Sequence, residues 1–93
     1  MFVSADYLFV VGHYPIVSTG EHGGLKCLKQ LDALLRRYKA NAYIAGHDHN
    51  LQHIRLRTDG DEAMNYIISG AASRTDRSTK HIKDVPDDAL LFR

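Results

Sequence analysis

Residues 7–13 read Tyr-Leu-Phe-Val-Val-Gly-His, and residues 42–49 read Ala-Tyr-Ile-Ala-Gly-His-Asp-His. Each stretch is a short apolar run that ends at a glycine followed by a histidine, which predicts a strand and then a turn. The first run, Tyr7 to Val11, is continuously apolar and predicts a strand buried on both faces. The glycine after each run is expected to make the sharp turn that aims the histidine.

An amphipathic helix is predicted between these two strands. Apolar residues recur there at spacings of three and four, with mostly charged residues between them, and they fit a helix of about three to four turns. Strand, helix and strand in this order predict a βαβ unit with a parallel strand pair. Cys27 lies just off the apolar stripe and is expected to be buried filler rather than a reactive thiol. The stripe consists of Leu25, Leu28, Leu31, Leu34, Leu35 and Tyr38.

An antiparallel hairpin is predicted after the histidine cluster. Residues 51–58 alternate between apolar and polar, Asp59-Gly60 is a turn signal, and residues 64–69 supply the partner strand. Residues 73–88 read as a polar loop, and another apolar run begins at Ala89. The predicted fold class is therefore α/β, with one βαβ unit followed by an antiparallel hairpin.

Composition narrows the function classes. The 93 residues have a mass of 10.5 kDa and are 44% hydrophobic, so they fit one small globular domain. A formal charge of +1 argues against a nucleic-acid or anionic-membrane partner. A single cysteine excludes a disulfide scaffold and a cysteine-rich zinc module. The N-terminus lacks a basic segment before its first apolar run and does not support a signal peptide, so the compartment stays open.

His13 and His47 each follow a predicted strand of the βαβ unit. The carboxyl ends of parallel strands meet at one edge of a sheet, and neighbouring strands lie about 4.8 Å apart, so the two imidazoles are expected to reach one point. His47 and His49 are separated by one residue, which suits two neighbouring metal ions such as those that clamp a phosphoryl group. Asp48 is a candidate for orienting a ligand.

The remaining histidines have alternative interpretations. Glu21-His22-Gly23 lies in the loop after the first strand and supplies either an acid/base or phosphate-binding group, or simply a loop that precedes a helix. His53 and His81 are expected to be structural or solvated. Lys80 and Lys83, which flank His81, are expected to mark a solvated loop.

Three segments together resemble the purple acid phosphatases of the tartrate-resistant type, in the calcineurin-like metallophosphoesterase superfamily. They are Val11-Gly12-His13-Tyr14-Pro15, Glu21-His22-Gly23 and Ala45-Gly46-His47-Asp48-His49-Asn50-Leu51-Gln52, and the similarity runs from about Asp6 to Phe92. The resemblance implies a sandwich of two packed β-sheets flanked by helices. It also implies hydrolysis of phosphate monoesters at acidic pH, a binuclear centre of Fe with Fe, Zn or Mn, and a lysosomal or secreted protein.

The resemblance assigns roles residue by residue. His13 and His47 would bind the divalent metal and His49 the ferric ion, while His22 and Glu21 would face the substrate phosphate. The family's other ligands come from Gly-Asp-x-Gly, Gly-Asp-Asn-x-x-Tyr and Gly-Asn-His-Asp motifs, and none of these occurs in the sequence. Residues 1–93 are therefore expected to be the C-terminal part of an incomplete metallophosphoesterase domain. Alone they would hold at best one ion, and the N-terminal part of the same domain would complete the site.

Two alternatives remain beside the hypothesis that the chain is part of a phosphatase. The chain could be a truncated, non-catalytic fragment that binds metal weakly or acts by interaction. It could also be a small mononuclear zinc module built on the same three histidines. Whether the 93-residue chain is itself an enzyme stays open.

Overall fold

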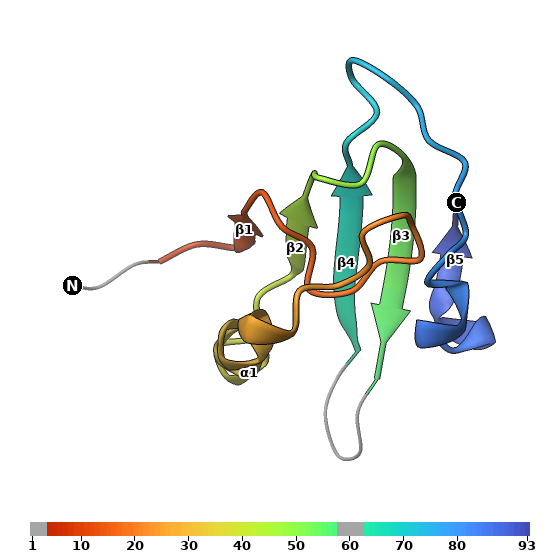
Figure 1. Cartoon of the computed structure of the whole chain (residues 1–93). Helices are drawn as coiled ribbons and strands as arrows, with labels where there is room; N and C mark the ends of the chain where they lie inside the picture. Colours follow the sequence, from red (N-terminus) through yellow and green to blue (C-terminus); the bar gives the residue numbers. More distant parts are fainter. Residues whose placement is uncertain (1–3, 58–62) are drawn as a thin grey trace.

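The computed structural model describes residues 4–57 and 63–93, which form one mixed five-stranded sheet with a single α-helix (Figure 1). The strand order is β1-β2-β4-β3-β5. β1, β2 and β4 are parallel, whereas β3 runs antiparallel to both β4 and β5. The predicted α/β class, the βαβ unit and the hairpin are therefore confirmed. The strands are β1 Phe9–Val11, β2 Ala42–Ala45, β3 Leu51–Leu56, β4 Met64–Ser69 and β5 Leu90–Phe92.

The helical segment begins with a 3-10 turn, η1 (Lys26–Leu28), and continues as α1 (Lys29–Arg37). Only Leu35 of α1 is buried, and Leu31 is partly buried against the core, so part of the predicted stripe faces the sheet. The prediction that Cys27 is buried is wrong, because η1 buries none of its residues and leaves this thiol exposed.

β1 also differs from its prediction. It lies at the edge of the described sheet and pairs with β2 alone, so Phe9 and Val11 are 56% and 73% exposed. Val10 points to the other face and is half-buried. A continuous apolar run predicts burial on both faces only where neighbours cover both faces, and no described segment covers the outer face of β1.

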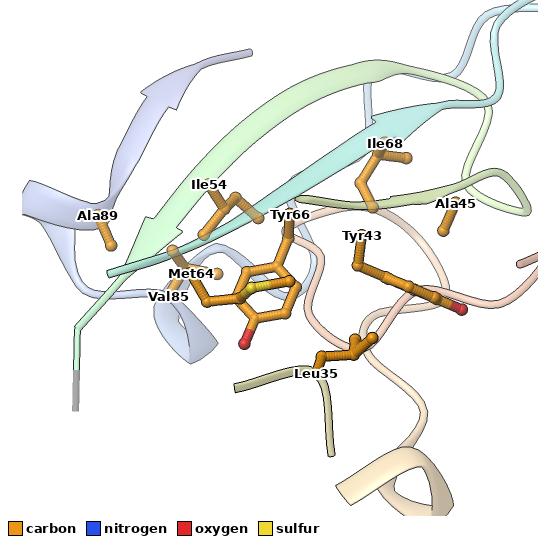
Figure 2. Packing of buried hydrophobic residues seen from close by; sticks show 9 residues of the cluster. All are labelled: Leu35, Tyr43, Ala45, Ile54, Met64, Tyr66, Ile68, Val85 and Ala89. Atoms are coloured by element: carbon orange, nitrogen blue, oxygen red, sulfur yellow. The ribbon is translucent and has the colours of Figure 1, made fainter. Parts of the chain in front are cut away.

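The hydrophobic core lies on one face of the sheet. Tyr43, Tyr66 and Ile54 project from three adjacent strands toward α1 and the C-terminal segment (Figure 2). The C-terminal segment is residues 73–93. The sequence predicted only a polar loop over residues 73–88, and the structure differs. The segment contains two 3-10 turns, η2 (Ile82–Asp84) and η3 (Asp87–Ala89), and it buries Val85 against the core.

The opposite face of the sheet, here called the bare face, carries apolar side chains that no described segment covers. Register places Val11, Ile44 and Ile67 side by side on it. α1 and the segment that leads into it lie on the core side (Figure 1). The exposed apolar members of the bare face are Phe9, Val11, Leu51 and Phe92.

The predicted turn at Asp59-Gly60 lies outside the described residues, but the strands on either side of it are paired. Leu56 of β3 is opposite Met64 of β4, and Leu51 is opposite Ser69. Among the described residues, no helix is long and apolar enough to cross a membrane.

Candidate functional site

The carboxyl ends of β1 and β2 bring His13 and His47 together. Gly12 N donates to the Ile44 carbonyl (3.0 Å) and Gly46 N donates to the His13 carbonyl (2.9 Å), so the parallel pairing continues past the strands. The ring centroids of His13 and His47 are 5.2 Å apart. Parallel strand pairing thus places two histidines from distant parts of the sequence at one edge of the sheet.

The glycines before these histidines act differently from the prediction. His47 itself, not Gly46, adopts the left-handed backbone conformation, with φ of 67°. Gly12 is required for space instead, because a Cβ there would overlap the hydroxyl group of Tyr43. That hydroxyl donates to the Tyr14 carbonyl (2.8 Å) and fixes the backbone beside His13.

His22 joins the two histidines from the loop before the helix. Its ring centroid lies 4.2 Å from that of His47. Tyr14, which the sequence analysis did not single out, packs edge-on against both His13 (4.8 Å) and His47 (4.9 Å). Glu21 and Lys80 are both exposed and form a long ion pair (3.9 Å). Lys80 is thus solvated, as expected, and it also contacts the loop that carries His22.

The cluster favours a neutral His47. Partial burial lowers the pKa of the His47 imidazole, and the neighbouring His22, His13 and His49 lower it further, while Asp48 opposes the shift. A neutral imidazole has the free lone pair that metal coordination needs.

The donor set fits part of a metal centre. Imidazole is a suitable ligand for Fe, Zn and Mn-type ions, and His13 and His47 present two such rings at one place. His49 follows on the same turn, where its carbonyl accepts a hydrogen bond from Asp76 N (2.7 Å). Within residues 4–57 and 63–93, however, no group of three or more His, Cys, Asp or Glu side chains is arranged to hold a metal ion.

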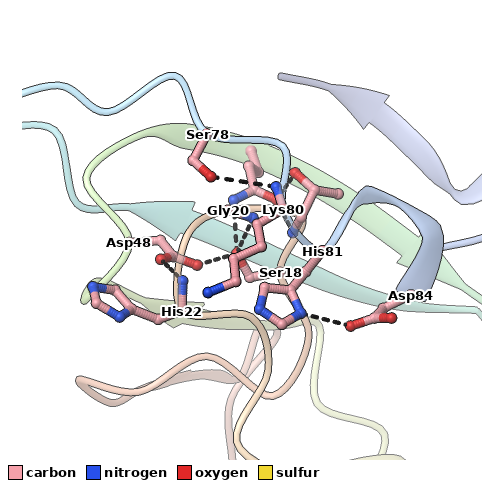
Figure 3. Close-up of polar contacts among 10 residues, drawn as sticks. Ser18, Gly20, His22, Asp48, Ser78, Lys80, His81 and Asp84 are labelled. Carbon is pink, nitrogen blue, oxygen red and sulfur yellow. Dashed lines mark hydrogen bonds and ion pairs between the residues drawn. The ribbon is translucent and has the colours of Figure 1, made fainter.

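A buried network of hydrogen bonds holds the loop that carries His22. Asp48 is only 1% exposed, and its carboxylate accepts hydrogen bonds from His22 N (2.8 Å) and from the Ser18 hydroxyl. Figure 3 shows dashed lines that join Asp48 to both of these residues. Asp48 is therefore hydrogen-bonded to the loop that carries His22, while its expected role in orienting a ligand stays a prediction.

Gln52 extends this network at the start of β3. Its carbonyl oxygen accepts from Thr19 N and from the Thr19 hydroxyl, both at 2.9 Å. Its amide nitrogen donates to Ser18 Oγ (2.9 Å) and Asn50 Oδ1 (2.7 Å). Every buried side-chain nitrogen and oxygen in the described residues has a partner. The sequence did not indicate roles for Ser18 and Gln52 because the contacts that join them to Asp48 and to each other span 30 and 34 residues.

The C-terminal segment reaches the same loop. His81 N donates to the Thr19 carbonyl (3.2 Å), and the His81 ring packs on Gly23, whose φ is +69°. The ring is also within hydrogen-bond distance of Asp84 (2.9 Å), as Figure 3 shows. His53 contacts Asn65 Oδ1 (2.9 Å) on the bare face, so both histidines are held structurally, as expected.

The sequence and the structure were compared with those of known proteins. No family model matches the chain. Tartrate-resistant acid phosphatase type 5 from rabbit and from human is 44% identical over 88 residues, covering 94% of this chain and 26% of each relative. Purple acid phosphatase 17 of Arabidopsis thaliana is 38% identical over 71 residues, 75% of this chain and 20% of that relative. The solved structure of GAP50, the anchor in the inner membrane complex of Plasmodium, matches with a TM-score of 0.66 and 31% identity over 95% of this chain and 25% of that one.

These likenesses show that the chain is homologous to purple acid phosphatases along part of their length. The relatives that match over nearly its whole length include those of the tartrate-resistant type. The chain spans about a quarter of their length.

Proposed function

We propose that this chain is part of a metal-dependent phosphatase that hydrolyses phosphate monoesters. His13, His47 and His49 would be metal ligands, and His22 and Glu21 would face the substrate phosphate. The observation that carries the proposal is the convergence of His13, His22 and His47 at the carboxyl edge of the parallel strands. Kinship with acid phosphatases supplies the reaction class.

The chain's own residues would bind and orient. His13 and His47 present their rings side by side, and Tyr14 packs against both and limits their rotation. His22 is exposed beside His47, so its ring can donate a hydrogen bond to a phosphate oxygen. The family's binuclear centre, Fe with Fe, Zn or Mn, would supply Lewis-acid chemistry when bound.

Residues 1–93 would form the C-terminal part of the metallophosphoesterase domain. The described residues offer fewer metal-binding side chains than a closed centre needs, and the relatives are about four times as long. We propose that the remaining ligands come from the N-terminal part of the same domain, in a lysosomal or secreted protein. The bare face supports this, since it leaves apolar side chains open to a further layer.

The test is metal content by elemental analysis together with hydrolysis of p-nitrophenyl phosphate at acidic pH. Both are measured on the purified chain, on His47→Ala and on the matched control His53→Gln. Metal binding that His47→Ala abolishes and His53→Gln preserves would support the ligand assignment. Equal binding by all three samples would overturn it.

A second candidate is a non-catalytic fragment that binds metal weakly, favoured by the lack of a three-ligand group among the described residues. The same samples separate the two candidates. Two metals per chain with turnover would place the working centre in this chain. One metal without turnover, and no gain when the N-terminal part of a relative is added, would favour the fragment.

A further inference from the structure

We propose that Asp48 is a positioning residue for His22. It would act through the backbone of the His22 loop and would touch neither metal nor substrate. The inference rests on the proposed function, in which His22 faces the substrate phosphate. It assigns to Asp48 the task of holding His22 against His47.

The loop has a buried stalk and an exposed tip. Ser18, Thr19 and Gly20 are buried, whereas Glu21 and His22 are exposed. One Asp48 oxygen accepts from the Ser18 hydroxyl in the stalk, and the other accepts from His22 N at the tip (2.8 Å). A single carboxylate therefore sets the distance between the two ends of the loop.

The stalk is also packed too closely to shift over the carboxylate. A Cβ on Gly20 would lie 2.7 Å from the carboxylate carbon of Asp48 and 2.8 Å from Asn50 Nδ2. Ser18 Oγ in turn accepts from Gly20 N (3.1 Å) and from Gln52 Nε2 (2.9 Å). The hydroxyl hydrogen is thereby directed to Asp48.

Asp48 is itself held in place by its own backbone. Its N–H donates to the Gly46 carbonyl (2.8 Å), and its carbonyl accepts from Asn50 N (2.9 Å). The residue before it is His47, so the group that holds His22 is covalently joined to the residue that His22 contacts. This link is what keeps the His22 and His47 ring centroids at 4.2 Å.

Removing the carboxylate should release His22 without disturbing the sheet. In Asp48→Ala, the His22 amide loses its acceptor and the stalk loses the partner of Ser18. Asp48→Asn keeps one oxygen for His22 N but presents an N–H₂ group to a Ser18 hydroxyl that already accepts two hydrogen bonds. The Asn variant should therefore retain part of the effect and the Ala variant little.

The experiment is NMR on the 93-residue chain, with Asp48→Asn, Asp48→Ala and the exposed control Asp87→Asn. We expect the nuclear Overhauser effects between the His22 and His47 rings to weaken in the order wild type, Asn, Ala. We expect exchange of the His22 amide to accelerate tenfold or more in Asp48→Ala, while the amides between β2 and β4 keep their rates. If Asp48→Ala does not fold, Asp48→Asn, which keeps the shape of the side chain, carries the test.

Two results would overturn the proposal. Unchanged ring contacts in Asp48→Ala, or in Asp48→Asn where the Ala variant does not fold, would mean that Asp48 does not position His22. Equal acceleration of the sheet amides would mean that Asp48 only stabilises the fold.

Titration with inorganic phosphate separates this proposal from the proposed function. If Asp48 acts through His22, Asp48→Asn weakens phosphate affinity in the wild-type background and has no further effect in His22→Ala. An equal loss in both backgrounds would contradict the positioning role. If no sample responds to phosphate, the proposed function fails for this chain, while the NMR result still decides the role of Asp48.

Discussion

Gly70 and Gly46 lie close to the same histidine turn, yet space is restricted at only one of them. A Cβ on Gly70 would overlap the carbonyl oxygen of Asp48, which is backbone and cannot rotate away. A Cβ on Gly46 would meet nothing closer than the His13 carbonyl, at 3.9 Å. Gly70 therefore permits β4 to end against the turn, whereas Gly46 leaves room for a methyl group.

We expect Gly70→Ala to lower the free energy of unfolding by about 1–3 kcal/mol, because the overlap must be relieved by shifting the backbone. Gly46→Ala should change it by no more than about 0.5 kcal/mol. Urea denaturation followed by circular dichroism measures both. Similar losses in the two variants would show that the turn is sensitive to any side chain and not to the overlap at Gly70.

Local sequence predicts the site only in part. Gly-His after a strand is a local signal, and parallel pairing then dictates that His13 and His47 meet at one edge. The contacts of Asp48 with Ser18 and His22 span 30 and 26 residues and carry no periodicity, so no sequence pattern indicates them. Such contacts depend on how the loop packs, which only the tertiary structure shows.

At the scale of elements, one tyrosine joins the helix to the sheet. The Tyr66 hydroxyl in β4 donates to the Asp32 carboxylate of α1 and accepts from Arg36 (2.9 Å), also in α1. Burial raises the pKa of Tyr66, and the hydrogen bond to Asp32 raises it further. Because Leu35 is the buried residue of α1, this polar junction is a large part of the helix's attachment.

We expect Tyr66→Phe to lower the free energy of unfolding by about 1–2 kcal/mol at neutral pH. The raised pKa also makes the native state keep a proton that the unfolded chain loses above about pH 10. Wild-type stability should therefore fall as pH rises through that value, and it should fall less steeply in Tyr66→Phe. The exposed control Tyr38→Phe should match wild type at each pH, as measured by urea denaturation; parallel pH curves for wild type and Tyr66→Phe would contradict the argument.

Elements themselves are well predicted where periodicity is strong. The alternation in β3 and the apolar run of β2 give the correct strands because each pattern reports which faces are buried. β1 and Cys27 were misjudged for one reason: an apolar residue reports a tendency to be buried, not the presence of a segment that covers it. Val85 was missed because residues 73–88 contain only Ile82 and Val85 as large apolar residues, which are too few to establish a period.

At the scale of the whole molecule, the described residues cover the sheet on one side only. The accessible surface is 6794 Å². A compact chain of this mass exposes about 5,400 Å². The bare face and the edge of β1 contribute exposed apolar side chains to this surface.

We expect the isolated chain to bind a hydrophobic dye such as ANS and to associate as concentration rises, because exposed apolar faces and strand edges do so. Replacing Val11 and Leu51 together by threonine keeps strand propensity and should reduce both effects without loss of secondary structure. Sedimentation velocity and dye fluorescence measure the outcome. A wild-type chain that stays monomeric and does not increase the fluorescence of ANS would show that the bare face does not promote association.

His47 adopts a backbone conformation that suits glycine better than histidine. A residue with a Cβ in the left-handed backbone conformation costs about 1–2 kcal/mol of stability. The free energy of unfolding of His47→Gly should therefore be about 1 kcal/mol higher than that of His47→Ala. A library of variants selected only for heat resistance should thus tend to replace this histidine. A library selected for phosphate-ester turnover should keep it, and the conflict between the two selections would measure how much strain the chain tolerates for the sake of one imidazole.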